Sequence, residues 1–395
     1  RSNQLFAAIR TAGDKASVEL RAAYAEVIKN IPARTRANKL TILAERQTDK
    51  RQTHVHVRGD FLRPGDRVKS GTPKVLPSLK ARGEPDRLDL ANWIVRPENP
   101  LTSRVMVNQI WSHLFGRGLV STLDDFGTHG AKPSHPELLD WLAVELQKRG
   151  WSRKELIRLI VTSATYRQSS HYRQEVTDID PENVLLARQS RFRLPAEDIR
   201  DSQLAAGGLL DYRIGGPSFR PPIPNDMAAV SFGFDGPKQR WEPDSPADQH
   251  RRSLYMLFQR TAPNPFLVTF DAPDSLVCCP RRQRSNSPLQ ALSTLNEAVS
   301  YEAACGLARS LSVGCGSISD KIKKAFSYCL GREPTPDELD CLQRFCQQQR
   351  KLLETNDAEA CVIAGPCTHG DLQENAVLTL LARVVLNLEE FIVRE

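Results

Sequence analysis

Four helix-start signals, each followed by apolar residues at helical spacing, are the feature that most limits what this chain can fold into. Each signal pairs a Ser or Thr with a Glu or Gln three residues later, and the signals begin at Ser134, Ser152, Ser287 and Thr335. In such a capping box, both side chains accept hydrogen bonds from backbone N–H groups that the first helical turn leaves unpaired. The apolar residues that follow recur every three or four positions, which is typical of a buried helix face. The sequence therefore predicts a mainly α fold, of the α+β kind, with a helical core.

Other helices are marked by their ends. Asp86 is expected to cap a helix that runs to about Val95, and Gly116 is expected to end another that starts near Leu101. The apolar pattern near the C-terminus predicts a last helix over residues 374–391.

Strands are expected at two places only. The segment THVHVRG, which begins at Thr53, alternates valines with polar residues and predicts a half-buried strand. The segment RRSLYMLFQR, which begins at Arg251, predicts a second short strand. Residues 207–248 are rich in Gly, Pro and Asp, which is typical of a long irregular loop. This central loop is a favourable place for function.

This organisation predicts a short leading segment and a larger domain. We expect residues 1–52 to be a helical N-terminal segment, either the tail of a preceding domain or a linker. Residues 53–395 should form the main domain, in which 53–206 and 249–395 could be two lobes joined by the segment 207–248. The sequence does not begin with the charged and then apolar residues of a leader peptide, so we expect the chain to be a processed or excised fragment.

Composition argues against several classes of protein. Hydrophobic residues make up 40% of the chain and charged residues 26%, as in soluble globular proteins. No run approaches the ~18 apolar residues of a membrane span. The net charge is +7, with arginine clusters at residues 188–193, 251–252 and 281–284. Because only 7% of residues are aromatic, nucleic acid is not an expected partner; a solvated surface is favoured, and a polyanion site is the alternative.

The cysteines are unevenly placed. All nine lie from Cys278 onward, and none forms a CxxC or CxxCH motif. A haem attachment site is therefore not expected in this chain, and neither is a paired-cysteine zinc site. Cys361 and Cys367 flank a short loop and could form a disulfide in an oxidising compartment. We expect no metal and no cofactor in the chain itself.

Several motifs occur in the order found in a known family. They are THVHVRGDFLRPGDRV, RLDLANWIVRPENPLTSRVMVNQIWSHLFGRGLV, DDFGTHGAKPSHPELLDWLA, GWSRKELIRLIVTSATYRQSS and SPLQALSTLNE, with LLARVVLNLEEFIVRE at the end. Together they resemble the planctomycete-type PSD domain (domain of unknown function 1553). The likeness extends from about Thr53 to the end of the chain.

The resemblance implies where the domain is located and which domains accompany it, but it does not imply a reaction. Members of this family are typically exported proteins in which the domain follows a second domain of unknown function and, further upstream, a c-type cytochrome domain. This implies an extracytoplasmic location and a c-type cytochrome module as partner, with haem c held outside this chain. No catalytic residue is established for the family. Gln109 replaces an arginine of the family's Asn-Arg-x-Trp motif, and Glu297 replaces an aspartate, so an anion site at that arginine would be weakened here.

The strongest candidate site is a polar loop between two predicted helices. It carries two carboxylates and two imidazoles within twelve residues, namely Asp124, Asp125, His129 and His135. Such groups could bind a divalent metal or perform acid–base catalysis. The structural alternative is that the aspartates bind loop amides and that His135 lies beside a helix cap. We expect this loop to line the main polar cleft.

A second candidate lies on the strand predicted at Thr53. His54, His56, Arg58 and Asp60 would share one strand face, because side chains alternate along a strand. Two histidines at positions i and i+2 can bind a metal. A solvated polar face is the favoured interpretation.

Two further candidates are an asparagine and a group of arginines. Asn108 shares a helix face with Trp111 and could bind a ligand, although it more simply ties down a neighbouring loop carbonyl. Arg281, Arg282 and Arg284 could bind phosphate or an acidic partner. The alternative for these arginines is a solvated surface.

Three functions follow from these observations. The first, which rests on family architecture, is an extracytoplasmic ligand-binding or interaction module beside a c-type cytochrome domain of the same or a partner chain. The second is a hydrolase or another enzyme that uses the Asp/His loop, and the third is a polyanion-binding module. An enzyme would need these groups in a concave pocket with perturbed ionisation, whereas a polyanion binder would lose affinity steeply with salt.

Overall fold

The computed structural model describes residues 52–81, 83–223, 241–260, 262–313, 316–366 and 371–394, together with Ala22, Ala23 and Glu26. The chain divides between Thr72 and Pro73 into two compact units, and each unit is described by itself. Almost all of the predicted N-terminal segment lies outside the described residues. The start of the main domain at residue 53 and its two lobes stay predictions.

The described part of the first unit is a small antiparallel hairpin. Strand β1 (Thr53–His56) pairs with β2 (Pro64–Val68), and a 3-10 turn, η2 (Val57–Gly59), lies between them. The strand predicted at Thr53 is therefore present, but it ends at His56.

The single strand face predicted for four polar residues is wrong. Arg58 has a φ of 55° inside η2, so the backbone leaves the extended conformation before Asp60. The predicted burial is also reversed: His54 and His56 are half-buried, whereas Val55 is 56% exposed. The hairpin reverses within the polar run, and a reversal destroys the alternation on which the prediction rested.

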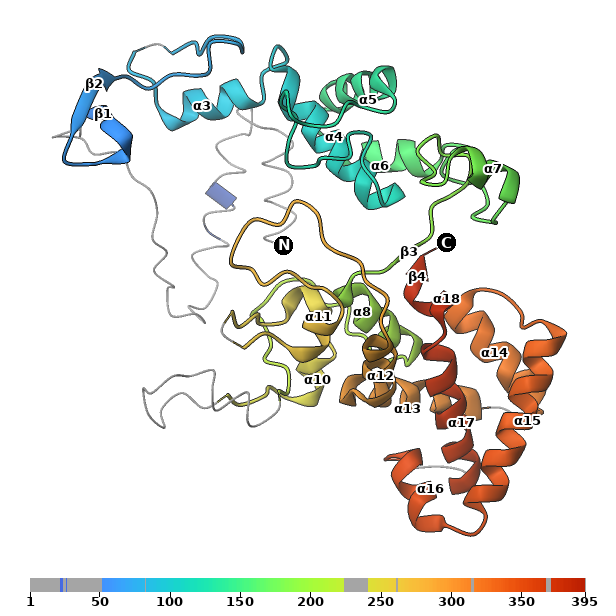
Figure 1. Ribbon diagram of the computed structural model, residues 1–395. Coiled ribbons are helices and arrows are strands. Elements are labelled where there is room, and N and C mark those ends of the chain that lie inside the picture. The colour runs from blue at the N-terminus through green and yellow to red at the C-terminus, as the bar shows by residue number, and fades with distance from the viewer. Residues whose placement is uncertain are drawn as a thin grey trace. The chain divides into compact units, whose positions relative to one another are not determined.

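Helices dominate the second unit, which confirms the mainly α prediction (Figure 1). The first group of helices comprises α3 (Arg87–Ile94), α4 (Pro100–Phe115), α5 (Pro136–Lys148), α6 (Arg153–Val161) and α7 (Gln174–Ile179). Asp86 caps α3 through a full capping box, and α4 ends at Gly116, as expected. Helices α4, α5 and α6 share a hydrophobic core in which Val107, Leu146 and Leu156 are fully buried.

A second group of helices forms the larger core. It comprises α8 (Ala196–Ala206), α10 (Pro246–Gln249), α11 (Pro265–Thr269), α12 (Pro288–Asn296), α13 (Ala298–Ser312), α14 (Ile318–Leu330), α15 (Pro336–Leu353), α16 (Asp357–Ala364), α17 (Leu372–Leu386) and α18 (Glu389–Ile392). Helix α13 packs against both α17 and α8. Two glycines permit the second contact, because a Cβ on Gly306 would lie 2.3 Å from the carbonyl oxygen of Gly207.

A two-stranded sheet connects these two groups of helices. Strand β3 (Phe192–Arg193) pairs antiparallel with β4 (Val393–Arg394) at the C-terminal end of the described chain (Figure 1). The Arg394 guanidinium donates to the carbonyl oxygen of Leu114 at 2.8 Å and to the Tyr166 hydroxyl. The end of α4 is thereby joined to the strand pair. Strands of two residues are too short to show a sequence period, and this sheet was not predicted.

The capping signals are only partly reproduced. Thr335 opens α15 with a full box, and the Ser152 hydroxyl accepts from the backbone of α6. The box predicted at Ser134 is wrong: α5 begins one residue later than predicted, with His135 as its cap and without a side-chain capping bond. The competing partner is the carbonyl oxygen of Leu119, to which both the backbone N–H and the hydroxyl of Ser134 donate.

Two longer elements also differ from prediction. The strand expected from Arg251 is wrong: the segment forms a 3-10 turn, η3 (Ser253–Tyr255), flanked by isolated bridges at Arg251 and Met256. The helix expected after Ser287 is divided at Glu297, where the backbone is extended, into α12 and α13. The last predicted helix is likewise divided into α17 and α18.

Candidate functional site

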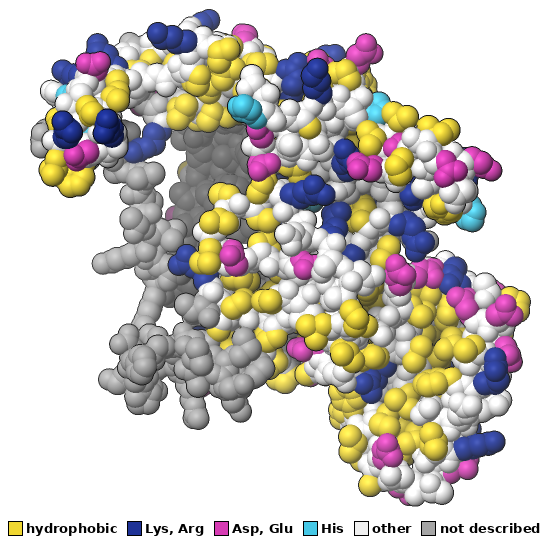
Figure 2. Space-filling model, viewed as in Figure 1, with side chains coloured by type: hydrophobic (Ala, Val, Ile, Leu, Met, Phe, Trp, Pro, Cys, Tyr) yellow, Lys and Arg dark blue, Asp and Glu magenta, His cyan; other side chains and the backbone are white. Residues whose placement is uncertain are grey.

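A charged cleft of about 1330 Å³ lies in the second unit. Five segments line it: the end of α4 with the loop that follows it as far as Leu123, the stretch from β3 into α8, the η3 turn with the residues after it, the end of α11, and the residues that follow α11. We call residues 273–286, between α11 and α12, the strap. The strap has no helix or strand of its own. Arg and Lys side chains gather on the middle of the face drawn in Figure 2.

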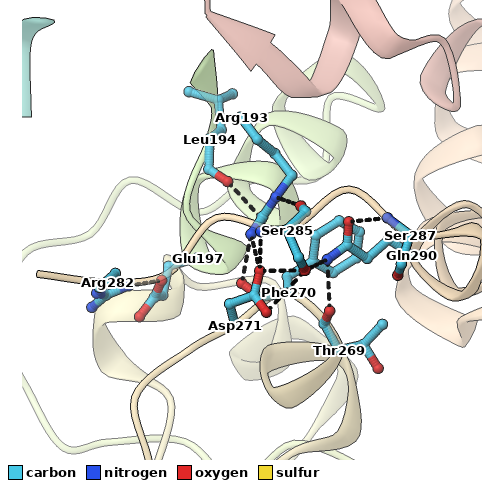
Figure 3. Close-up of polar contacts among 10 residues, drawn as sticks. All are labelled: Arg193, Leu194, Glu197, Thr269, Phe270, Asp271, Arg282, Ser285, Ser287 and Gln290. Carbon is cyan, nitrogen blue, oxygen red and sulfur yellow. Dashed lines mark hydrogen bonds and ion pairs between the residues drawn. The ribbon is translucent and has the colours of Figure 1, made fainter. Parts of the chain in front are cut away.

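A clamp fixes the C-terminal end of the strap (Figure 3). The buried Arg193 guanidinium donates through Nη2 to Asp271 Oδ2 at 2.6 Å and through Nε to the carbonyl oxygen of Ser285 at 2.8 Å. Asp271 in turn accepts from the Ser285 backbone N–H at 2.8 Å and from the Ser285 hydroxyl. Arginine, carboxylate and strap therefore form one closed hydrogen-bonded set.

The two ionisable groups of the clamp, Asp271 and Arg193, influence each other's pKa. Burial tends to raise the pKa of Asp271, but hydrogen bonds from Ser285 and the Arg193 charge outweigh it and lower the pKa below its usual value. Burial lowers the pKa of Arg193, and Asp271 opposes that shift. Asp271 stays charged at neutral pH because its pKa is lowered. Arg193 also stays charged, because the ordinary pKa of an arginine lies far above neutrality.

Gln290 extends the clamp into α12 (Figure 3). Its amide nitrogen donates to the carbonyl oxygen of Thr269 at 2.9 Å and to the Ser285 hydroxyl at 3.0 Å. Its amide oxygen accepts from the backbone N–H of Ser287 at 3.2 Å. The glutamine predicted to cap a helix thus also holds the strap against α11.

The strap presents three arginines to the cleft: Arg281, Arg282 and Arg284. Arg282 pairs with Glu197 at 2.7 Å. Arg284 stacks on the ring of Phe192, with 4.2 Å between the guanidinium carbon and the ring centroid. Among the residues that the structure describes, no carboxylate lies within ion-pair distance of Arg281 or Arg284.

The electrostatic field of the strap is positive. Burial, followed by the charges of three neighbouring arginines, lowers the pKa of the Arg284 guanidinium. Burial also lowers the pKa of the His113 imidazole at the end of α4, and Arg284 and Arg282 lower it further. His113 is therefore neutral at pH 7, and an anion placed here would relieve repulsion between cations.

The first turns of α8 add carboxylates to the cleft. Glu197 is occupied by Arg282, and Asp201 accepts from both the backbone and the hydroxyl of Ser253, at 2.8 and 2.7 Å. Burial and the charges of the two neighbouring carboxylates raise the pKa of Asp198.

The Asp/His loop is not part of this cleft. Ser121 and Leu123 line the cleft, but the lining residues do not include Asp124, Asp125, His129 or His135. Asp125 Oδ1 instead accepts from the backbone N–H of Gly127 at 2.7 Å, and His135 Nδ1 lies 3.0 Å from the Ser134 hydroxyl. Within the described ranges, no three His, Cys, Asp or Glu side chains form a group that could hold a metal ion.

Asn108 ties down a loop, as its structural interpretation predicts. Its side chain is fully buried, and it donates to the carbonyl oxygen of Val120 at 2.9 Å while accepting from the N–H of Val120 at 2.8 Å. Gly118 permits this arrangement, since a Cβ there would lie 2.8 Å from the amide. The second candidate, His54 and His56 with Arg58 and Asp60, belongs to the first unit.

The strap arginines, a candidate from the sequence, line the cleft, but most of the groups around them were not predicted. Arg193 falls in one of the arginine clusters, yet nothing in the sequence marks it as the buried member. Asp271 stands 78 positions from Arg193, and no local pattern connects them. Of the cysteines, Cys279 lines the cleft, whereas Cys367 lies outside the described residues and Cys361 has a free thiol.

No helix in the described part of the chain has both the length and the hydropathy needed to cross a bilayer. No curated protein and no solved structure matches the chain significantly. The model of one family, PSD1, described as a protein of unknown function (DUF1553), matches residues 86–346. This match spans well over half of the sequence and includes every residue named above as lining the cleft. The chain therefore belongs to the PSD1 (DUF1553) family.

Proposed function

We propose that this domain binds an anionic ligand in the cleft, with Arg281 and Arg284 as its main contacts. One observation carries the proposal: these cations line a large concave space, and among the described residues neither has a carboxylate within ion-pair distance. Surface arginines are normally solvated or paired, whereas cations gathered in a cleft focus their field on whatever enters it.

The chemistry of the groups favours a phosphate or carboxylate. A guanidinium offers N–H donors in a planar fork that matches the oxygens of either anion. Stacking on Phe192 occupies one face of Arg284 and leaves its N–H edge for a ligand. A neutral His113 can donate one further hydrogen bond without adding charge.

Titration calorimetry with inorganic phosphate and with succinate would test this proposal. Replacing Arg284→Gln should weaken binding by at least about tenfold, since a charge-assisted contact is removed from a partly buried site. Arg344→Gln is the matched control, because Arg344 is exposed and pairs with Asp340 within α15. The affinity should also fall as salt is added.

Two results would contradict the proposal. The first is the absence of saturable binding by either anion at low salt. The second is an equal affinity in wild type and R284Q.

The setting of the domain is a separate proposal, supported only by the architecture of the family that the sequence resembles. In that setting the domain is exported and works beside a c-type cytochrome module of the same or a partner chain. Binding of the domain to that module, produced separately, would be measured by a shift of the haem absorption or of the sedimentation boundary. An unchanged boundary at high concentration of both would contradict the partnership.

A further inference from the structure

The cleft carries an unpaired negative charge as well as unpaired positive ones. Among the described residues, the three carboxylates at the start of α8 differ in their partners. Glu197 is held by Arg282, and Asp201 is held by Ser253. The Asp198 carboxylate lines the cleft but makes no hydrogen bond or ion pair with any residue that the structure describes.

This carboxylate and the unpaired arginines are held by different elements. Asp198 stands in the first turn of α8, which continues directly from β3. Arg284 rests on Phe192, and the clamp at Ser285 holds the backbone one residue further on. Arg282, the strap cation that lowers the pKa of Asp198, forms its ion pair with Glu197. The two kinds of charge are therefore both available to a ligand in one cleft.

We propose that the ligand is bipolar, with an anionic group held by Arg281 and Arg284 and an ammonium or other donor group held by Asp198. This inference rests on the proposed anion site and names the chemical class that the site selects. Asp198 is then the residue that determines specificity, because an anion without a donor group would leave its carboxylate unmatched. Asp198 is exposed in the free protein, so the cost arises when a ligand covers its carboxylate without pairing with it, and this discriminates between ligands.

The ionisation of Asp198 agrees with this role. Burial and two neighbouring carboxylates raise its pKa, and the Arg282 charge offsets them only in part. A ligand ammonium would supply that charge and return the pKa toward its usual value. The preference for an ammonium should therefore weaken as the pH falls and Asp198 becomes protonated.

Two series of probes, matched except for the ammonium, would test the inference. One series is alkyl phosphates of two to eight carbons, and the other is the ω-aminoalkyl phosphates of the same lengths; both would be titrated calorimetrically at pH 7. At one or two chain lengths the aminoalkyl phosphate should bind about tenfold more tightly, as expected for one charge-assisted contact. In Asp198→Asn this preference should disappear, while the alkyl phosphates should bind at least as tightly as they bind the wild type.

Asp340→Asn serves as the control, since Asp340 is exposed in α15 and pairs with Arg344. It should keep the wild-type preference. Equal binding of the two series at every length would overturn the bipolar ligand and leave the anion site intact. An ammonium preference that persists in D198N would also overturn the assignment. If neither series binds, the anion site itself fails, and the bipolar ligand fails with it.

Discussion

The Asp/His loop and the strap are both irregular and charged, but they use their charges differently. In the loop, Asp125 accepts from the backbone two residues later, and its own carbonyl oxygen accepts from Thr122. In the strap, the backbone is held from outside by Arg193 and Asp271, while strap side chains line the cleft.

This difference shows why charge density in the sequence does not by itself mark a site. An acidic residue near glycine finds backbone donors within its own turn, so its carboxylate oxygen is hydrogen-bonded locally. An arginine side chain only donates, so its charge is balanced only where the fold places a carboxylate beside it. Where the fold supplies that carboxylate, as Glu197 does for Arg282, the charge is structural. Where the described residues supply none, as at Arg284, the charge has no ion-pair partner.

The largest effect is expected at the clamp. Asp271→Ala would leave the Arg193 guanidinium buried without its carboxylate and should lower the free energy of unfolding by about 3 kcal/mol or more. Asp125→Ala, the matching change in the loop, removes one bond to a local backbone N–H and should cost about 1 kcal/mol or less. Urea denaturation of both variants measures the difference. Equal destabilisation would mean that the strap is no better anchored than the loop.

A smaller effect on stability is expected at Gly116, which ends α4 beside Phe192 and Arg284. Gly116 has a φ of +80°, and a Cβ there would lie 2.9 Å from the Phe192 ring and 3.3 Å from an Arg284 nitrogen. Gly116→Ala should therefore cost about 2 kcal/mol, from backbone strain plus displacement of the stack. Gly150→Ala also has a positive φ, of +60°, but has open space around its Cβ, so it should cost only about 1 kcal/mol.

Thermal unfolding compares the two glycine variants. In addition, G116A should weaken phosphate binding and G150A should not. If both lose the same stability and both bind phosphate as wild type does, Arg284 does not depend on this packing.

Much of the helical fold could be predicted because its signals are local. Asp86 and Thr335 each cap a helix with a partner three residues away, and the sequence contains both halves of each box. The same rule failed at Ser134, since the carbonyl oxygen of Leu119 is a partner 15 positions away. A rule based on neighbouring residues cannot include a hydrogen-bond partner that only the fold brings close.

The candidate site could be predicted only in part, for the same reason. The run of strap arginines is visible in the sequence, but their contacts depend on Glu197, which pairs with Arg282, and on Phe192, on which Arg284 stacks. The hydrogen bond from Arg193 to Ser285 spans 92 positions. The Asp/His loop was a predicted site because its polar residues are close in sequence. The same closeness lets these side chains form hydrogen bonds with the backbone of the loop.

The smallest expected effect is a pH dependence of stability that comes from His113 in the cleft. Because the pKa of His113 is lowered in the folded protein, the unfolded chain binds more protons between that pKa and about 6.5. The free energy of unfolding should therefore rise with pH through this range and level off above it. His113→Gln should flatten the rise. Added phosphate should also flatten it in wild type, because a bound anion would offset the arginine charges that help to lower the pKa of His113. Urea midpoints between pH 5 and 8 measure all three profiles; a phosphate-insensitive slope in wild type would place the anion away from His113.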